Sequence, residues 1–115
     1  MIDGFFRMAY TGMTGSGFGL LVFQGGSIAG ADVSGGTYNG TYTENPSTGA
    51  ISIQVTMALP AGVAPVQSGV VLAAPISVPI AVTISPADIS SEKTVLLQTP
   101  LGPVNATFKK IRDIH

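Results

Sequence analysis

The sequence predicts an all-β fold, an eight-stranded antiparallel up-and-down β-barrel formed by a single domain over residues 1–115. Eight short segments rich in strand-forming residues follow one another, and clusters of glycine, proline, asparagine and serine separate them. The chain holds 15 glycines, and no charged helical repeat is longer than about two turns. Eight antiparallel strands in chain order close naturally into a barrel, although a β-sandwich has the same periodicity and remains the alternative.

The first half of the chain contains four of the predicted strands, at residues 2–10, 17–24, 27–33 and 37–43. Gly25-Gly26 predicts a two-residue hairpin turn, because both central residues of the favoured turn need positive φ. Both faces of 17–24 are apolar, so we expect both to be covered. Asn39-Gly40 is also a hairpin signal, but that turn would leave a strand of about three residues. We therefore predict one strand with a bend or bulge at Gly40.

The second half contains the other four predicted strands, at residues 50–58, 77–85, 93–99 and 104–111. The first of them shows the clearest alternation, in which Ile51, Ile53, Val55 and Met57 alternate with polar residues and predict a half-buried strand. Pro79 cannot donate a ladder hydrogen bond, so it predicts a strand edge, a bulge or a strand start. Residues 86–92 predict a turn that can include one helical turn.

Residues 59–76 interrupt this pattern with prolines and glycines among apolar residues. One interpretation is an irregular loop lying over the end or side of the barrel. The other is a flap that faces a protein partner or a second copy, since long loops in compact domains are often functional. The candidate residues for such a contact are Leu59, Val63, Val66, Val70, Leu72 and Ile76.

Charged residues are few, and their number bears on whether the chain binds nucleic acid or a membrane. Charged residues make up 10% of the chain, against about 25% in an average soluble domain, and the net charge is −1. No basic patch is large enough to predict nucleic-acid binding. No clean apolar run of about 18 residues predicts a membrane helix. The start of the chain does not resemble a signal peptide and there is no cysteine, so we expect a cytoplasmic protein.

The residues that carry most enzyme chemistry are scarce, and we expect no enzyme, metal or cofactor. His115 is the single histidine and lies at the end of the chain. The six acidic residues are scattered, so no carboxylate pair or metal cluster is predicted. Asp32 is the candidate polar anchor for a ligand at the barrel mouth. Its alternative roles are an Asx turn or an ion pair with Arg7.

Several short motifs resemble those of the GrlR-like proteins, a family of bacterial repressors associated with type III secretion. They are Asp3-Gly4, the Gly17-Phe18-Gly19 strand, Gly30-Ala31-Asp32, Tyr38-Asn39-Gly40 and the ending Phe108-Lys109-Lys110-Ile111-Arg112-Asp113. The resemblance covers nearly the whole chain and implies a lipocalin-like (calycin-like) barrel, often a homodimer, that binds an activator protein through an acidic loop. This sequence has no such acidic run, so that partner does not carry over.

Two hypotheses for function follow. The first is a non-enzymatic regulatory module that acts through protein contacts as a homodimer, as the resemblance implies and as low surface charge favours. The second is a carrier of a small apolar, lipid-like ligand in an apolar cavity. The candidate residues that would line the cavity are Phe5, Phe6, Met8, Phe18, Leu20, Tyr38 and Tyr42.

Overall fold

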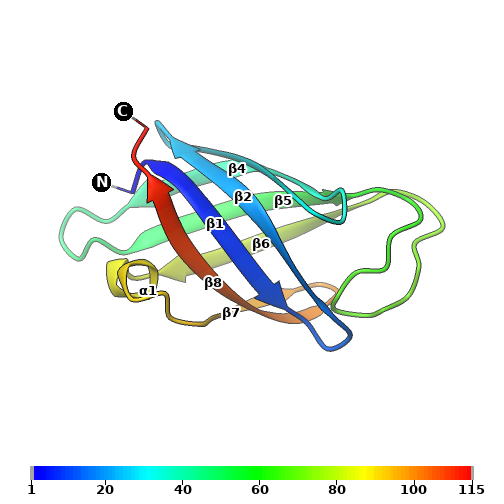
Figure 1. Ribbon diagram of the computed structural model, residues 1–115. Coiled ribbons are helices and arrows are strands. Elements are labelled where there is room, and N and C mark those ends of the chain that lie inside the picture. The colour runs from blue at the N-terminus through cyan, green and yellow to red at the C-terminus, as the bar shows by residue number, and fades with distance from the viewer. Residues whose placement is uncertain (1, 115) are drawn as a thin grey trace.

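The computed structural model describes residues 2–114, which form one antiparallel sheet curled almost completely round on itself (Figure 1). All eight strands lie within two residues of the bounds predicted from the sequence. They are β1 (Gly4–Thr11), β2 (Ser16–Gln24), β3 (Ser27–Asp32), β4 (Thr37–Glu44), β5 (Ile51–Leu59), β6 (Ile76–Ile84), β7 (Val95–Thr99) and β8 (Gly102–Arg112). A short helix, α1 (Pro86–Ser90), connects β6 to β7.

The order of strands in the sheet is β6-β5-β4-β3-β2-β1-β8-β7. β6 and β7 lie beside one another, but no hydrogen-bonded ladder joins them, so the barrel is nearly closed. The predicted antiparallel barrel is confirmed, and the β-sandwich alternative is wrong because all eight strands belong to one sheet. Since β6 is an edge of that sheet, Pro79 lies on an edge strand as predicted.

The glycines explain two local features. Gly25 and Gly26 have φ angles of 59° and 86°, which confirms the predicted hairpin turn between β2 and β3. At Gly40 the predicted bulge is wrong, because the pairing of β4 with β3 and with β5 passes through this residue without a register shift. Gly40 instead permits close approach of the strands: a Cβ there would lie 2.0 Å from the Gln54 carbonyl oxygen.

Helix α1 begins with a reciprocal pair of hydrogen bonds. The Asp88 amide donates to Ser85 Oγ at 3.2 Å, and the Ser85 amide donates to Asp88 Oδ2 at 2.9 Å. This capping box satisfies two backbone donors that the helix start would otherwise leave without partners. Pro86 occupies the first turn, where its missing amide hydrogen costs nothing. The helical turn that the sequence predicted at 86–92 is therefore confirmed.

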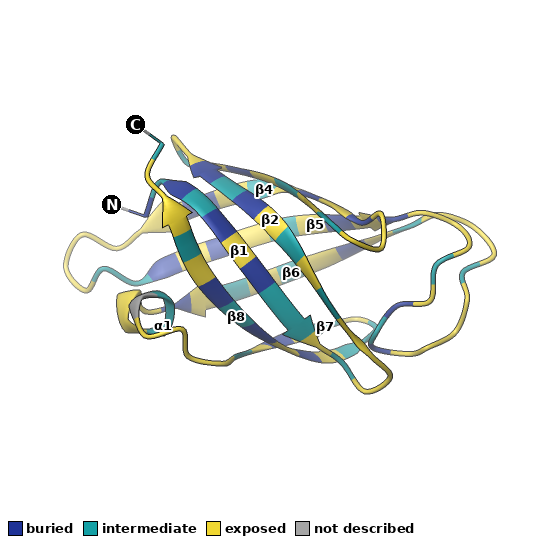
Figure 2. Cartoon of the chain, in the orientation of Figure 1, coloured by how far each residue is buried: buried dark blue, intermediate teal, exposed yellow. Residues whose placement is uncertain are grey.

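Inward-facing side chains alternate with exposed ones along most strands (Figure 2). The predicted face of β5 is correct, because Ile51, Ile53 and Met57 are buried and Val55 is half-buried. Phe23 lies at the centre of an aromatic cluster, with its ring 5.1 Å from the rings of both Phe6 and Tyr42. These three aromatic side chains thus gather towards the α1 end of the barrel.

Candidate functional site

Residues 60–75, which connect β5 to β6, fold over the end of the barrel opposite α1 (Figure 1). The amide and the hydroxyl of Thr14 donate to the Val66 carbonyl at 2.9 and 2.8 Å. Gln67 Nε2 donates to Thr99 Oγ1 at 3.4 Å. These bonds tie the loop to the β1–β2 turn and to the β7–β8 hairpin. We call this the loop end of the barrel.

The loop also has internal structure. The Gly62 amide donates to the Leu72 carbonyl at 2.8 Å, and the Leu72 amide donates to the Val63 carbonyl at 2.9 Å. The Gly69 amide closes a turn by donating to the Pro65 carbonyl at 2.8 Å. Val63 and Leu72 pack against the core from above. The loop therefore has hydrogen bonds and core contacts of its own and covers this end of the barrel.

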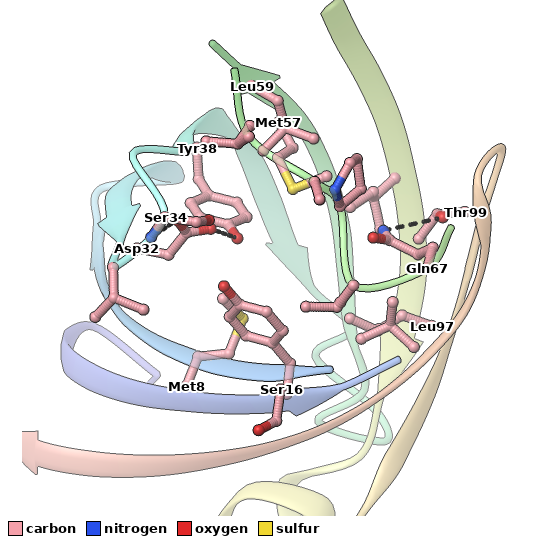
Figure 3. A pocket seen from close by; sticks show the side chains of 18 residues that line it. Met8, Ser16, Asp32, Ser34, Tyr38, Met57, Leu59, Gln67, Leu97 and Thr99 are labelled. Carbon is pink, nitrogen blue, oxygen red and sulfur yellow. Dashed lines mark hydrogen bonds between the residues drawn. The ribbon is translucent and has the colours of Figure 1, made fainter. Parts of the chain in front are cut away.

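Beneath the loop lies a cavity of about 190 Å³ (Figure 3). It is bounded by the inner faces of several strands and by the loop itself, and most of its lining is apolar. The apolar side chains include Met8, Met57, Leu59, Ile80, Leu97 and Val104. Two polar groups face one another across it: the Asp32–Tyr38 pair on one wall and the Gln67–Thr99 pair on the other (Figure 3).

Asp32 is the acidic residue that lines the cavity, and its carboxylate accepts four hydrogen bonds. Its Oδ1 atom accepts hydrogen bonds from the Ser34 amide at 3.0 Å, the Ser34 hydroxyl at 2.8 Å and the Gly36 amide at 2.9 Å. Its Oδ2 atom accepts one bond, from the Tyr38 hydroxyl at 2.6 Å. The Oδ1 bonds form an Asx turn, one of the two alternatives expected from the sequence. The other alternative, an ion pair with Arg7, is wrong, because Arg7 pairs with Glu92 at 3.4 Å.

The pKa values of Asp32 and Tyr38 are shifted in opposite directions. Burial on its own would raise the pKa of Asp32, but the hydrogen bonds from Tyr38, Ser34 and Gly36 outweigh it and lower that pKa below its usual range. Burial, reinforced by the bond to the carboxylate, raises the pKa of Tyr38 well above its ordinary value. These opposite shifts favour an ionised Asp32 and a neutral Tyr38 hydroxyl at neutral pH.

A second Asp–Tyr pair lies at the α1 end. The Tyr42 hydroxyl donates to Asp3 Oδ1, and the Gly25 amide donates to Asp3 Oδ2 at 3.3 Å. Burial, followed by the bond to Asp3, raises the pKa of Tyr42 to about 12. The hydrogen bond from Tyr42, followed by that from Gly25, lowers the pKa of Asp3. Beside this end, a wider hollow of about 480 Å³ is lined by charged residues of both signs, including Glu44 and Lys110.

The structure separates the side chains that the sequence grouped as one cavity lining. Met8 and Tyr38 line the cavity at the loop end. Phe6 and Tyr42 are buried in the aromatic cluster near the α1 end and do not line it.

Three of the predicted lining residues face outwards, and their assignment was wrong. Phe18 and Leu20 are 58% and 44% exposed, and Phe5 lies on the same outer side of β1 as Arg7. Because side chains alternate along a strand, the inner face of β2 belongs to its odd-numbered residues. Gly17 is one of these, and a Cβ there would lie 2.5 Å from the Tyr10 hydroxyl oxygen. The expectation that both faces of β2 are covered is also wrong for this chain.

The predicted contact loop is mostly turned onto the barrel. Leu59 is buried, and Val63, Val66, Leu72 and Ile76 pack against the core. Val70 is the exception, with 67% of its surface exposed. The structure thus agrees with the interpretation of a loop lying over the barrel end. The interpretation of a flap presenting all six side chains to a partner is wrong, because five of them contact the chain's own core.

Several cavity residues were not identified from the sequence. Tyr10 and Met57 lie on predicted inner faces, so the alternation of the strands could have revealed them. Gln67 and Thr99 meet only because the loop crosses to the β7–β8 hairpin, and no local pattern signals that path. Gln67 is the one buried polar residue of the described chain, with 9% of its surface exposed.

Further features bear on the type of site. Residues 2–114 contain no group of three or more acidic, histidine or cysteine side chains placed to hold a metal ion. His115 lies outside the described residues. No described helix has the length and apolar character needed to cross a membrane. Comparisons of this chain with family models, curated proteins and solved structures found no match.

Proposed function

We propose that this protein is a non-enzymatic binding module that holds a small, mostly apolar molecule in the cavity under residues 60–75. The observation that carries the proposal is the cavity itself, a mostly apolar space partly covered by residues 60–75, with one carboxylate in its wall. Binding sites for small molecules typically combine an apolar lining with a few placed polar groups.

The volume limits the ligand. About 190 Å³ is less than the roughly 300–1,000 Å³ of drug-sized sites. The middle of the barrel adds a void of only about 50 Å³, lined by apolar side chains such as Phe23, Ile28 and Phe108. The proposed ligand is therefore a compact molecule and not a long lipid chain.

The methionines provide a direct test. Met8 and Met57 line the cavity, whereas Met13 is 84% exposed on the β1–β2 turn. In a protein with ¹³C-labelled methionine methyl groups, titration with benzyl alcohol should shift the Met8 and Met57 signals and leave Met13 unchanged. A Val63→Phe variant, which fills the cavity from the loop, should remove those shifts. Equal shifts at Met8, Met13 and Met57, or none at any concentration, would contradict the proposal.

A second candidate function, contact with a protein partner, is supported by the outer surface of the barrel. Phe18, Leu20, Val33 and Ile111 are each at least 44% exposed and surround one shallow groove. Two charged residues also line this groove: Arg7 is paired with Glu92, and Asp32 accepts hydrogen bonds from its own turn and from Tyr38. Because both charged groups already have partners within the chain and the rest of the lining is apolar or glycine, we propose a second copy of this chain as the occupant.

Sedimentation velocity tests this contact. A Leu20→Lys variant should dissociate the dimer, because it buries a charge in the proposed interface, whereas a Val70→Lys variant on the exposed part of the loop should leave it intact. A wild-type protein that sediments as a monomer at high micromolar concentration would rule the dimer out. The regulatory role and the cytoplasmic location expected from the sequence stay predictions.

A further inference from the structure

We infer that the cavity at the loop end selects small organic cations, in which an ammonium group binds Asp32 and an apolar body fills the space beneath the loop. This inference rests on the proposed function and specifies its ligand class. Three features of the cavity support it: the sign of its charge, the unused capacity of the Asp32 carboxylate, and the character of its walls.

The first feature is the charge of the lining. Of the residues that line the cavity, Asp32 is the single charged one, and the lining contains no lysine, arginine or histidine. Neither of the ion pairs found among residues 2–114 involves Asp32. The carboxylate is therefore half-buried with no cationic side chain among the cavity residues, and a bound cation would supply the missing counterion.

The second feature is the number of hydrogen bonds that Asp32 accepts. A carboxylate offers about four lone-pair sites, two on each oxygen. Oδ1 accepts three bonds from the backbone and side chain of its own turn, whereas Oδ2 accepts one, from Tyr38. The Asx turn thus fixes the carboxylate through one oxygen, whereas the other accepts fewer bonds than its two lone pairs allow. This division makes Asp32 a rigid anchor that needs no rearrangement to bind a donor.

The third feature is the walls around the anchor. The rings of Tyr10 and Tyr38 and the thioethers of Met8 and Met57 all border the cavity. Aromatic faces and polarisable sulfur atoms interact favourably with a desolvated cation and with the carbon skeleton that carries it. A carboxylate ligand would meet the like charge of Asp32, and a neutral alcohol would gain a hydrogen bond without the ionic attraction.

A matched set of three probes tests the inference: benzylamine, benzyl alcohol and benzoate share one skeleton and differ in charge. Binding is followed by the Met8 and Met57 methyl signals at pH 7. We expect benzylamine to bind about tenfold more tightly than benzyl alcohol, and benzoate not to bind. Equal affinity for all three, or a preference for benzoate, would overturn the inference while leaving the binding function standing. If no probe moved the two signals, the proposed function itself would fail.

Two variants assign the selectivity to its residue. Asp32→Asn keeps an oxygen that can accept the turn hydrogen bonds but removes the charge, so it should bind the amine and the alcohol equally. Asp3→Asn alters the matching pair at the other end and should behave as wild type. A preference that persisted in a folded Asp32→Asn protein would contradict the inference.

Discussion

At the loop end of the barrel Tyr38 donates a hydrogen bond to Asp32, and at the α1 end Tyr42 donates one to Asp3. The two tyrosines lie four residues apart on β4 and face inwards, so one strand supplies the donor for both pairs. Both tyrosines have raised pKa values, and both aspartates have lowered ones. The two ends thus share one polar motif.

Their surroundings differ. At the loop end, no second charged side chain lines the cavity. At the α1 end, the adjacent hollow is lined by Glu44, Glu92, Lys109 and Lys110, and Lys110 also pairs with Asp113. The aspartate of the Asp–Tyr pair is therefore the single charge of the cavity at the loop end, whereas at the α1 end it is one of several charges. The comparison shows that the role of a polar pair depends on the charges left around it.

The largest expected difference between the ends concerns packing. Phe6→Ala should lower the free energy of unfolding by about 3–5 kcal/mol, because Phe6 is 1% exposed in the aromatic cluster. Met8→Ala should cost about 2 kcal/mol, because it removes a smaller side chain that borders the cavity, whereas Phe6 borders a hollow but also packs against Phe23. Urea denaturation of both variants measures the difference. Equal losses would show that the loop end is packed as tightly as the other.

The next effect separates the two aspartates. Asp32→Ala should destabilise the protein by about 1–3 kcal/mol, because it removes the acceptor of the hydrogen bonds that shape the turn before β4. Asp3→Ala should cost less, because Asp3 accepts bonds at a more open position. Thermal unfolding at pH 7 compares them, and a larger loss for Asp3→Ala would reverse the ranking.

The attachment of the loop can be weakened without altering the strands. A Cβ at Gly12 would lie 2.4 Å from the Val66 carbonyl oxygen, whereas one at Gly15 would lie at an ordinary 3.7 Å from the Val66 side chain. Gly12→Ala should therefore speed hydrogen exchange and proteolysis within residues 60–75, and Gly15→Ala should not. Unchanged protection in Gly12→Ala would mean that the loop does not depend on its approach to the β1–β2 turn.

The smallest effect is a displaced titration. Burial raises the pKa of all three tyrosines, that of Tyr42 to about 12. The pKa of these tyrosines is higher in the folded state than in the unfolded state. The stability that their neutral hydroxyl groups contribute to the fold is therefore present in full below pH 10, and it is lost as the pH rises through 12. Absorbance at 295 nm should therefore show the tyrosines ionising above, and not at, pH 10 while circular dichroism remains native. A normal step there, in a folded protein, would show that the hydroxyls are not held as described.

Strand positions were predictable because alternation and turn chemistry are local. The face of β5 and the hairpin at Gly25-Gly26 follow directly from neighbouring residues. The face of β2 was not predictable, because both of its sides are apolar and only the tertiary contact of Gly17 with Tyr10 distinguishes them. The bulge predicted at Gly40 was wrong for a related reason. The sequence shows that glycine is flexible, but it does not show that the neighbouring strand β5 leaves no room for a side chain at this position.

The candidate site was predictable in part. Asp32 and its Asx turn were identified, because the turn is formed by residues 32–36 alone. The opposite wall was not, since Gln67 reaches Thr99 across 32 positions of sequence. The charge environment that distinguishes Asp32 from Asp3 also depends on which distant side chains line each end.

The seam between β6 and β7 limits the addition of strands from other chains to the edges of the sheet. Strand edges without partners are templates onto which other chains can add, and aggregation often begins there. In this barrel the two free edges face one another, so each shields the other from incoming chains. Pro79 has no amide hydrogen to donate to an added strand. One of the nine residues of β6 therefore cannot form the backbone hydrogen bond that fibril-like growth along this edge would need.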